Sequence, residues 1–365
     1  MTRAPSTWVA RRGARGVAIL AAVGSIGCAC SRKREAKPAV MPVGLADVSA
    51  AGSFDAGLAD ARPPRRTDGS PDPATDVAPA PAGCKLAALP WRFPAVPRVI
   101  AFGDVHGDLA AARRALTLGG VLDAQDHWQG GATWVVQTGD VLDRGDDEQA
   151  IVDLFERLEG EASAAGGRFI WLLGNHELMN AAGDLRYVTR GGFRDFEDVA
   201  GLGPLDRFAD APEPARARIA AFAPGGPYAR ILSNQTVVVV VGDTAFVHGG
   251  IIPGVAATLD ADQLATRCWL DGAGPPSPIL ERSDGPVWDR TVAGTDVDCG
   301  RLDRALAELH VARLVVGHTP QPNGITSACA DKVWRIDVGL AAYYGGPTEV
   351  LELTGATARP LRASR

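Results

Sequence analysis

Two side chains that commonly bind metal ions, Asp104 and His106, lie two residues apart in the segment GDVHGD. The residues before them, 98–102 (RVIAF), are apolar and rich in β-branched side chains, which predicts a buried strand. Gly103 and Gly107 allow the backbone to turn tightly around both side chains. We therefore expect Asp104 and His106 where a strand ends, and we look for partners at the ends of other strands.

The same arrangement recurs further along the chain, in the segments GDVLDRG, GNHE, HGG and GHT. Each segment follows an apolar run that predicts a strand, at residues 133–137, 169–173, 245–247 and 314–316. In an α/β sheet such turns lie together along the carboxyl ends of the strands, where ligands bind. The ligand-type residues in these turns are Asp140, Asn175, His176, His248 and His318.

Carboxylate, imidazole and amide ligands without a thiolate favour Mn, Fe or Zn over a soft-metal site. The carboxylate of Asp140 has two oxygens and can bridge two ions. A hydroxide held between ions about 3.5–4 Å apart is an in-line nucleophile for phosphoryl transfer. One such segment alone is more simply explained as a turn, a helix cap or a core histidine. Five in order, holding four of the six histidines, predict a dinuclear metal site.

The five segments resemble the motif series of the calcineurin-like metallophosphoesterases, and the DRG and GNHE forms resemble its phosphoprotein phosphatase branch. GDVLDRGDDE, LLGNHELMN, VVGHTPQ and IDVGLAAYYGG look most like the bacterial Shewanella-like protein phosphatases. The chain differs from the animal-type serine/threonine phosphatases, because Leu173 stands where they have Arg before GNHE and a SAPNY-like segment is missing. The resemblance therefore carries over neither their inhibitor sensitivity nor their regulatory subunits.

The resemblance implies two metal ions, divalent or of mixed valence, with a water-filled position on the first. The implied ligands of the first ion are Asp104, His106 and Asp140. The implied ligands of the second ion are Asp140, Asn175, His248 and His318. The open position is expected because the GHT segment lacks the second histidine of a G-H-x-H motif.

The resemblance also implies catalytic roles. His176 would be the general acid that protonates the leaving oxygen, and Asp143 would hold its imidazole in the charged form. Arg144 would bind non-bridging phosphate oxygens, which a planar guanidinium matches. Arg290 is a candidate for a second phosphate contact, and the alternative is an ordinary solvated arginine beside Asp289.

The implied fold is α/β, a single domain of two packed mixed β-sheets flanked by helices. Aromatic residues at near-helical spacing over 179–208 predict a small helical insertion after GNHE, either a self-packed surface layer or a lid that recognises substrate. Tyr343 and Tyr344 are expected to pack in the core or at the rim of the site, with a place lining its mouth as the alternative.

Residues 1–30 are predicted to be a lipoprotein-type signal segment, because basic residues precede a largely apolar run too short for a comfortable membrane span. The sequence SIGCAC predicts lipidation at Cys28, with plain secretion or an uncleaved anchor as alternatives. Residues 31–83 are rich in Ala, Pro and Asp, which predicts a disordered tether. Residues 84–361 are expected to form the metallophosphoesterase catalytic domain. We therefore expect export to the periplasm or cell surface, with membrane attachment through Cys28.

The 365 residues carry a net charge of −6. Residues 1–40 hold eight Lys or Arg and one Glu, a net +7, which leaves −13 for the rest. An acidic body argues against nucleic acid as a partner. The remaining cysteines lack C-x-x-C spacing, which argues against a zinc site. The sequence does not decide whether these cysteines form two disulfides, in any of three pairings, or remain free thiols: Cys84, Cys268, Cys299 and Cys329.

Together these observations predict a dinuclear metal-dependent phosphomonoesterase, with a metal-bridging hydroxide as nucleophile, that acts on phosphoproteins or phosphopeptides outside the cytoplasm. A hydrolase of small phosphate esters or dinucleoside polyphosphates is the first alternative, because symmetrical dinucleoside tetraphosphatases share the GDxHG, DRG, GNHE and GHT forms. A catalytically inactive binding module is the second, and the complete set of ligand residues argues against it.

Overall fold

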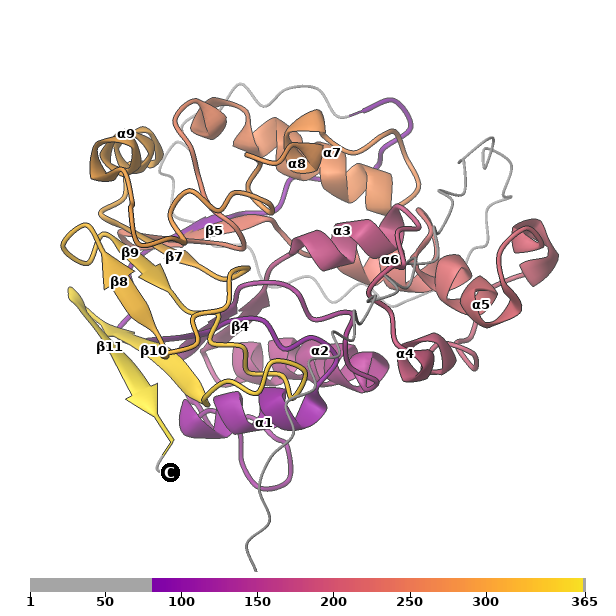
Figure 1. Ribbon diagram of the computed structural model, residues 1–365, viewed down its shortest axis with the longest axis horizontal. Helices are drawn as coiled ribbons and strands as arrows, with labels where there is room; N and C mark the ends of the chain where they lie inside the picture. The colour runs from indigo at the N-terminus through magenta and orange to yellow at the C-terminus, as the bar shows by residue number, and fades with distance from the viewer. Residues whose placement is uncertain (1–80, 364–365) are drawn as a thin grey trace, which may run out of the picture. The chain divides into compact units, whose positions relative to one another are not determined.

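The computed structural model of the protein describes residues 81–363 (Figure 1). The predicted signal segment, the lipidation site at Cys28 and nearly all of the predicted tether lie outside the described residues. Among the helices of this part of the chain, none has the length and apolar character needed to cross a membrane.

One mixed sheet has five strands in the order β11-β10-β2-β3-β4. Its parallel strands are β2 (Val99–Phe102), β3 (Trp134–Gln137) and β4 (Arg168–Trp171). Its antiparallel strands are β10 (Glu349–Thr354) and β11 (Thr357–Arg362). Every residue of β2 is buried, which explains why its sequence is a continuous apolar run without alternation.

The second mixed sheet has six strands in the order β1-β5-β6-β7-β9-β8. Its strands are β1 (Arg92–Phe93), β5 (Val238–Val241), β6 (Thr244–Val247), β7 (Arg313–Val316), β8 (Thr326–Ala328) and β9 (Val333–Arg335). The strand β6 pairs antiparallel with β5 and parallel with β7. Every strand predicted from an apolar run is present, within two residues of its expected bounds.

Helices cover both outer sides of the two sheets. Below them in Figure 1 lie α1 (Leu109–Leu118) and α2 (Glu148–Ala164). Above them lie α7 (Leu259–Leu270), α8 (Pro278–Glu281) and α9 (Cys299–Leu309), with the short 3₁₀ helix η2 (Val255–Ala257) before α7. This arrangement confirms the predicted α/β fold of two mixed sheets flanked by helices.

The predicted helical insertion after GNHE is present and longer than expected. It contains α3 (Asn175–Ala181), α4 (Arg190–Arg194), η1 (Leu205–Phe208), α5 (Glu213–Phe222) and α6 (Pro227–Leu232). The aromatic pattern that predicted it ends at residue 208, and most of the buried side chains of α5 are alanines. An alanine face gives little contrast between buried and exposed positions, which is why the sequence did not reveal α5.

Two disulfides settle the pairing that the sequence left open. Cys84 is bonded to Cys268, which ties the segment before β1 to α7, and the two Cα atoms are 5.4 Å apart. Cys299 is bonded to Cys329, which ties the start of α9 to the loop between β8 and β9. The four cysteines are therefore cross-links and not free thiols.

The two disulfides close loops of very different length, 184 and 30 residues. Replacing Cys84 and Cys268 by Ala should lower the free energy of unfolding by about 2–5 kcal/mol, because the unfolded chain regains entropy. Replacing Cys299 and Cys329 by Ala should also lower the free energy of unfolding, but by about 1–2 kcal/mol less than the first pair, since the loop is shorter. Urea denaturation of both double variants measures this difference, and a larger loss at the shorter loop would contradict the loop-entropy explanation.

Candidate metal centre

The ligand-bearing turns come from both sheets and meet at one edge of the sandwich. Asp104 and His106 follow β2, and Asp140 follows β3. His248 and His318 follow β6 and β7 in the other sheet. The side chains brought together here are between 0% and 5% exposed: Asp104, His106, Asp140, Asn175, His176, His248 and His318. The sequence therefore identified a set of residues that does come together.

Hydrogen bonds between the turns hold the two sheets together at this edge. The Nδ1–H of His248 donates to the carbonyl oxygen of Thr138, at 2.8 Å. The backbone N–H of His318 donates to the carboxylate of Asp104, with both oxygens at 3.2 Å. Because these bonds run from one sheet to the other, the position of each turn depends on the packing of both sheets.

The backbone of these turns is strained. The residues His106, Asp140, Asp143, Arg144 and His318 all have φ between 44° and 69°, which non-glycine residues rarely adopt. Such strain costs on the order of 1–3 kcal/mol per residue and clusters at functional sites. A Cβ on Gly174 would lie 2.2 Å from Oδ1 of Asp140, so only glycine fits between the two turns.

Glu177, the last residue of GNHE, supports Asp140 and is not placed as a ligand. Its carboxylate accepts hydrogen bonds from the backbone N–H groups of Asp140 and Val141, both at 2.9 Å, of Leu142 at 3.2 Å and of Gly174 at 2.7 Å. Sequence reasoning missed this residue. Its signal was the spacing from Gly174, because a Glu three residues after a helix cap is half of a capping box.

One cluster of polar atoms around Asp140 brings four possible metal-binding atoms together. The Nδ1–H of His248 donates to Thr138, so Nε2 is the ring nitrogen that faces the cluster. This nitrogen lies 3.0 Å from Oδ1 of Asn175, 3.2 Å from Oδ2 of Asp140 and 3.0 Å from Nδ1 of His318. Buried polar atoms this close must share either a proton or a metal ion. Ligand bonds of about 2.0–2.2 Å leave neighbouring donor atoms about 3 Å apart, so this cluster fits a metal ion.

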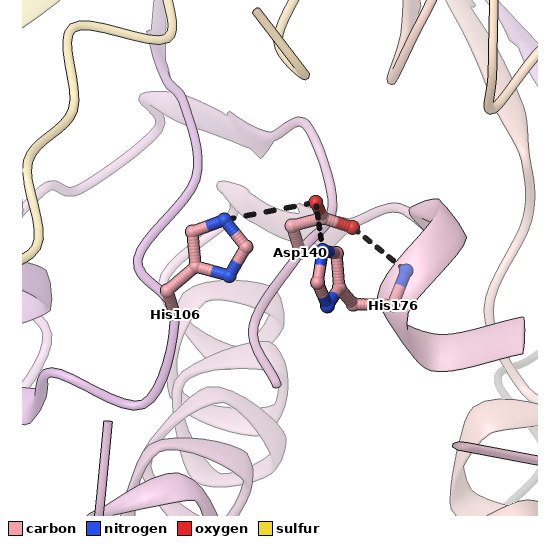
Figure 2. A group of neighbouring side chains, drawn as sticks. All are labelled: His106, Asp140 and His176. Carbon is pink, nitrogen blue, oxygen red and sulfur yellow. Dashed lines mark hydrogen bonds and ion pairs between the residues drawn. The ribbon is translucent and has the colours of Figure 1, made fainter. Parts of the chain in front are cut away.

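A second cluster, of His106 and His176, shares the carboxylate of Asp140 with the first (Figure 2). The Nδ1–H of His106 donates to the carbonyl oxygen of Leu142 at 2.9 Å, so its Nε2 carries the lone pair. This Nε2 lies 3.7 Å from Oδ2 of Asp140 and 3.9 Å from Oδ2 of Asp104. His176 approaches the same oxygen of Asp140 through its Nε2, also at 3.7 Å. Asp140 is thus shared by both clusters.

The electrostatics of the clusters also fit cations. Burial is the largest cause that lowers the pKa of His106 to about 3 and that of His318 to about 2. Both imidazoles are therefore neutral at pH 7, which is the form that binds metals. Burial, followed by the charges of Asp337 and Asp140, raises the pKa of Asp104 well above its usual value. A bound cation would reverse that shift, because it favours the charged carboxylate.

His176 is held by Asp143. Its Nδ1–H donates to Oδ2 of Asp143 at 2.5 Å, which leaves Nε2 facing the clusters. Burial lowers the pKa of His176, but the charge of Asp140 and the hydrogen bond to Asp143 outweigh burial and raise it. The structure also places Asn175 and His176 in the first turn of α3, so their side chains leave the helix in different directions.

Arg144 lies among three tyrosines at the mouth of the site. Its guanidinium carbon is 5.0 Å from the ring centroid of Tyr187, 5.6 Å from Tyr343 and 5.2 Å from Tyr344. Tyr343 is 66% exposed, so a place at the mouth, and not in the core, is what the structure shows. The guanidinium also donates to Nε2 of His106 at 2.6 Å. A cleft of about 530 Å³ opens beside these residues.

Arg290 lies beside the GHT turn and not in an ion pair with Asp289. Its Nη1 donates to Oγ1 of Thr319 at 2.7 Å and to the carbonyl oxygen of His318 at 3.2 Å. Asp289 accepts a hydrogen bond from Thr291 at 2.9 Å. Arg290 is exposed and lies beside His318, one of the residues of the first cluster.

Comparison with known proteins agrees with this geometry. Residues 97–322 match the family model of the calcineurin-like phosphoesterases. The chain is 40% identical over 301 residues to Shewanella-like protein phosphatase 2 of Arabidopsis thaliana, which covers 73% of this chain and 77% of the relative. It is 29% identical over 266 residues to Shewanella-like protein phosphatase 1 of Plasmodium berghei, which covers 68% and 69%.

Solved structures show the same fold. A cold-active protein-tyrosine phosphatase of a psychrophilic Shewanella species is similar with a TM-score of 0.60 and 24% identity, over 75% of this chain and 83% of that one. The family match extends over the described turns from GDVHGD to GHT, which carry the residues of both clusters. The chain belongs to the calcineurin-like phosphoesterase family and is a metal-dependent phosphatase.

Proposed function

We propose that the protein is a dinuclear metal-dependent phosphomonoesterase that acts on phosphoproteins or phosphopeptides. The observation that carries this proposal is the shared carboxylate of Asp140. Its Oδ2 lies 3.7 Å from Nε2 of His106 and 3.2 Å from Nε2 of His248. Asp104 and His106 would complete the first metal site with it, and Asn175, His248 and His318 would complete the second. Two ions of Mn, Fe or Zn bound there supply Lewis acidity and activate a water as nucleophile.

His176 is the general acid of the proposed reaction. Asp143 fixes the proton on Nδ1 and leaves the proton on Nε2 free to move to the departing oxygen. The raised pKa of the ring favours the protonated form that this step needs. The role of Asp143 is to orient the ring and to stabilise its positive charge.

Arg144 binds the phosphoryl group. Its guanidinium lies beside His106, which is where non-bridging oxygens of a phosphate on the first metal site would be. The surrounding tyrosine rings keep part of the site apolar and support the cation through their π faces. Arg290, beside the GHT turn, is a second contact for the same group.

Export is a further part of this proposal. Two disulfides within the catalytic domain support an oxidising compartment, since such bonds persist outside the reducing cytosol. We propose a periplasmic or cell-surface location, with a lipid anchor on Cys28.

Replacing Asp140 by Asn should remove most metal affinity together with activity. One neutral amide oxygen cannot serve two cations, whereas the other ligands remain in place. Metal analysis of the purified variant, compared with wild-type protein loaded with the same Mn or Zn concentration, measures the effect. Two ions retained at wild-type affinity would show that Asp140 does not bridge.

Replacing Arg144 by Ala should raise KM and lower kcat, because the phosphate contact exists in both the ground state and the transition state. Loss of a charge-assisted bidentate contact in a dry site is worth roughly 2–4 kcal/mol, a factor of about 30 to 1,000 in kcat/KM. Steady-state kinetics with a phosphopeptide, and inhibition by free phosphate, measure both effects. If KM and phosphate inhibition stay unchanged, Arg144 is structural.

Replacing His176 by Asn should reduce hydrolysis of a phosphoserine peptide by roughly 10²–10⁴-fold, the usual contribution of a general acid. The loss should be far smaller for p-nitrophenyl phosphate, whose leaving group needs no proton, and intermediate for phosphotyrosine peptide. Both metal ions should stay bound. Equal losses on all substrates, or a lost ion, would show that His176 acts as a ligand or only structurally.

The same assay with the wild-type protein tests the substrate class. Phosphopeptides should be hydrolysed with Mn, Fe or Zn, and diadenosine tetraphosphate should be the poorer substrate. A preference for diadenosine tetraphosphate would favour the alternative, a hydrolase of small phosphate esters or dinucleoside polyphosphates.

Replacing Cys28 by Ser should move the protein from the membrane fraction to the soluble fraction, because a serine cannot take a thioether-linked lipid. Fractionation of cells that express either form measures this. The same distribution for both would mean secretion or another anchor.

A further inference from the structure

A buried arginine connects the helical insertion to the catalytic pair of Asp143 and His176. Arg218 lies in the middle of α5, and its side chain is 0% exposed. Its Nη2 donates to Oδ1 of Asp143 at 3.2 Å, and its Nε donates to Oδ1 of Asn180 at 2.8 Å. Sequence reasoning did not select Arg218, since it lies in an alanine-rich helix without a recognisable motif.

The same guanidinium is paired with a second buried carboxylate, that of Glu148 at the start of α2. Its Nη2 donates to Oε1 of Glu148 at 2.8 Å, and its Nη1 also contacts Oε2. Nη1 donates in addition to the carbonyl oxygen of Gly192, at 2.8 Å. The rings of Phe196 and Phe222 lie 4.9 Å and 5.2 Å from the guanidinium carbon. Arg218 is therefore fully bonded in an apolar setting, where a bond to a charged group is strong.

These contacts restrain Asp143 on its far side. Oδ2 of Asp143 accepts a hydrogen bond from Nδ1–H of His176. Oδ1 of Asp143 accepts hydrogen bonds from Nη2 of Arg218 at 3.2 Å and from Nδ2 of Asn180 at 3.0 Å. The backbone N–H of Asp143 also donates to Glu148. Asp143 has φ of 69°, so it needs such restraint to stay in place.

We infer that Arg218 is a positioning residue that acts through Asp143 to orient His176, and that the insertion is thereby a fixed part of the active site. This inference rests on the proposed function, in which His176 is the general acid. It argues against a self-packed surface layer, one of the two alternatives open from the sequence. A lid that recognises substrate, the other alternative, would be a fixed one, because a helix that supplies a fully buried ion pair to the site cannot open without exposing that pair.

If Arg218 only anchored the insertion, its hydrogen bonds to Asp143 and Asn180 would not be needed. The bonds to Glu148 and Gly192 already fix α5 against α2 and α4. The two remaining bonds of the guanidinium point to Asp143 and Asn180, on the side of His176. A lysine would offer a point charge without the planar fork that reaches these acceptors together.

The test uses two variants of the full-length, metal-loaded protein. Arg218→Lys keeps the positive charge and removes the fork. The double variant Arg218→Gln with Glu148→Gln removes both charges of the Arg218–Glu148 pair, so Glu148 is not left as an unpaired buried charge if the single variant fails to fold. Arg216→Gln is the matched control, because Arg216 lies in the same helix and, within residues 81–363, its guanidinium donates hydrogen bonds only to the carbonyl oxygens of Ala209 and Ala211.

Both Arg218 variants should lose more activity on a substrate whose leaving group needs a proton than on one whose leaving group does not. We expect kcat for a phosphoserine peptide to fall on the order of tenfold or more, part of the full contribution of a general acid. For p-nitrophenyl phosphate kcat should fall less than about threefold, with KM and bound metal unchanged, because that leaving group needs no proton. The control should match the wild type. An equal fall of kcat on both substrates would show that Arg218 has only a structural role. Unchanged kcat on both substrates would also overturn the inference.

A second readout does not depend on activity. In metal-free protein with ¹⁵N-labelled histidine, the Nδ1 proton of His176 should exchange with water more rapidly in both variants than in the wild type. Unchanged exchange would contradict the inference. His176→Asn, assayed in parallel, separates the two claims. If that variant shows no dependence on the leaving group, the proposed function fails. If it does and the Arg218 variants do not, only the role of Arg218 fails.

Discussion

The central constraint on this structure is the crowding of possible metal-binding atoms around one buried carboxylate. Nε2 of His248 lies 3.2 Å from Oδ2 of Asp140, and the same nitrogen lies 3.0 Å from Oδ1 of Asn175 and from Nδ1 of His318. This crowding of buried polar and charged groups is unfavourable unless they share positive charge. Metal ions resolve it, and this requirement explains why the fold brings these particular side chains together.

Holding the cluster requires support from the residues behind it. Glu177 binds the backbone of the Asp140 turn, Gly174 leaves room for the carboxylate, and His248 bonds across to the other sheet. A further layer fixes the catalytic pair, where Arg218 reaches Asp143 from the insertion. Several side chains of the site are thus positioned by a residue from a different element. This division explains how a site made of turns keeps a defined geometry, despite several residues with left-handed backbone conformations.

The sequence predicts the strands well, and the residues that it selects as ligands do come together, but it predicts the supporting residues poorly. Strand ends are visible because buried parallel strands are continuous apolar runs, and expected ligands such as Asp104 and His318 follow them within a few residues. Glu177 and Arg218 are ordinary charged residues in sequence, and only the packing of distant elements turns them into buried partners. The disulfide pairing likewise depends on which segments the fold brings together, and the position of Tyr343 depends on a loop with no periodic pattern.

The most direct test of a carboxylate that bridges two ions is the anomalous scattering of the metals themselves. Crystals of the protein grown with Mn²⁺ should give two anomalous-difference peaks about 3.5–4 Å apart, both within bonding distance of the carboxylate of Asp140. One peak should lie beside His106 and Asp104, and the other beside Asn175, His248 and His318. A single peak, or a pair in which Asp140 contacts only one ion, would contradict the dinuclear centre.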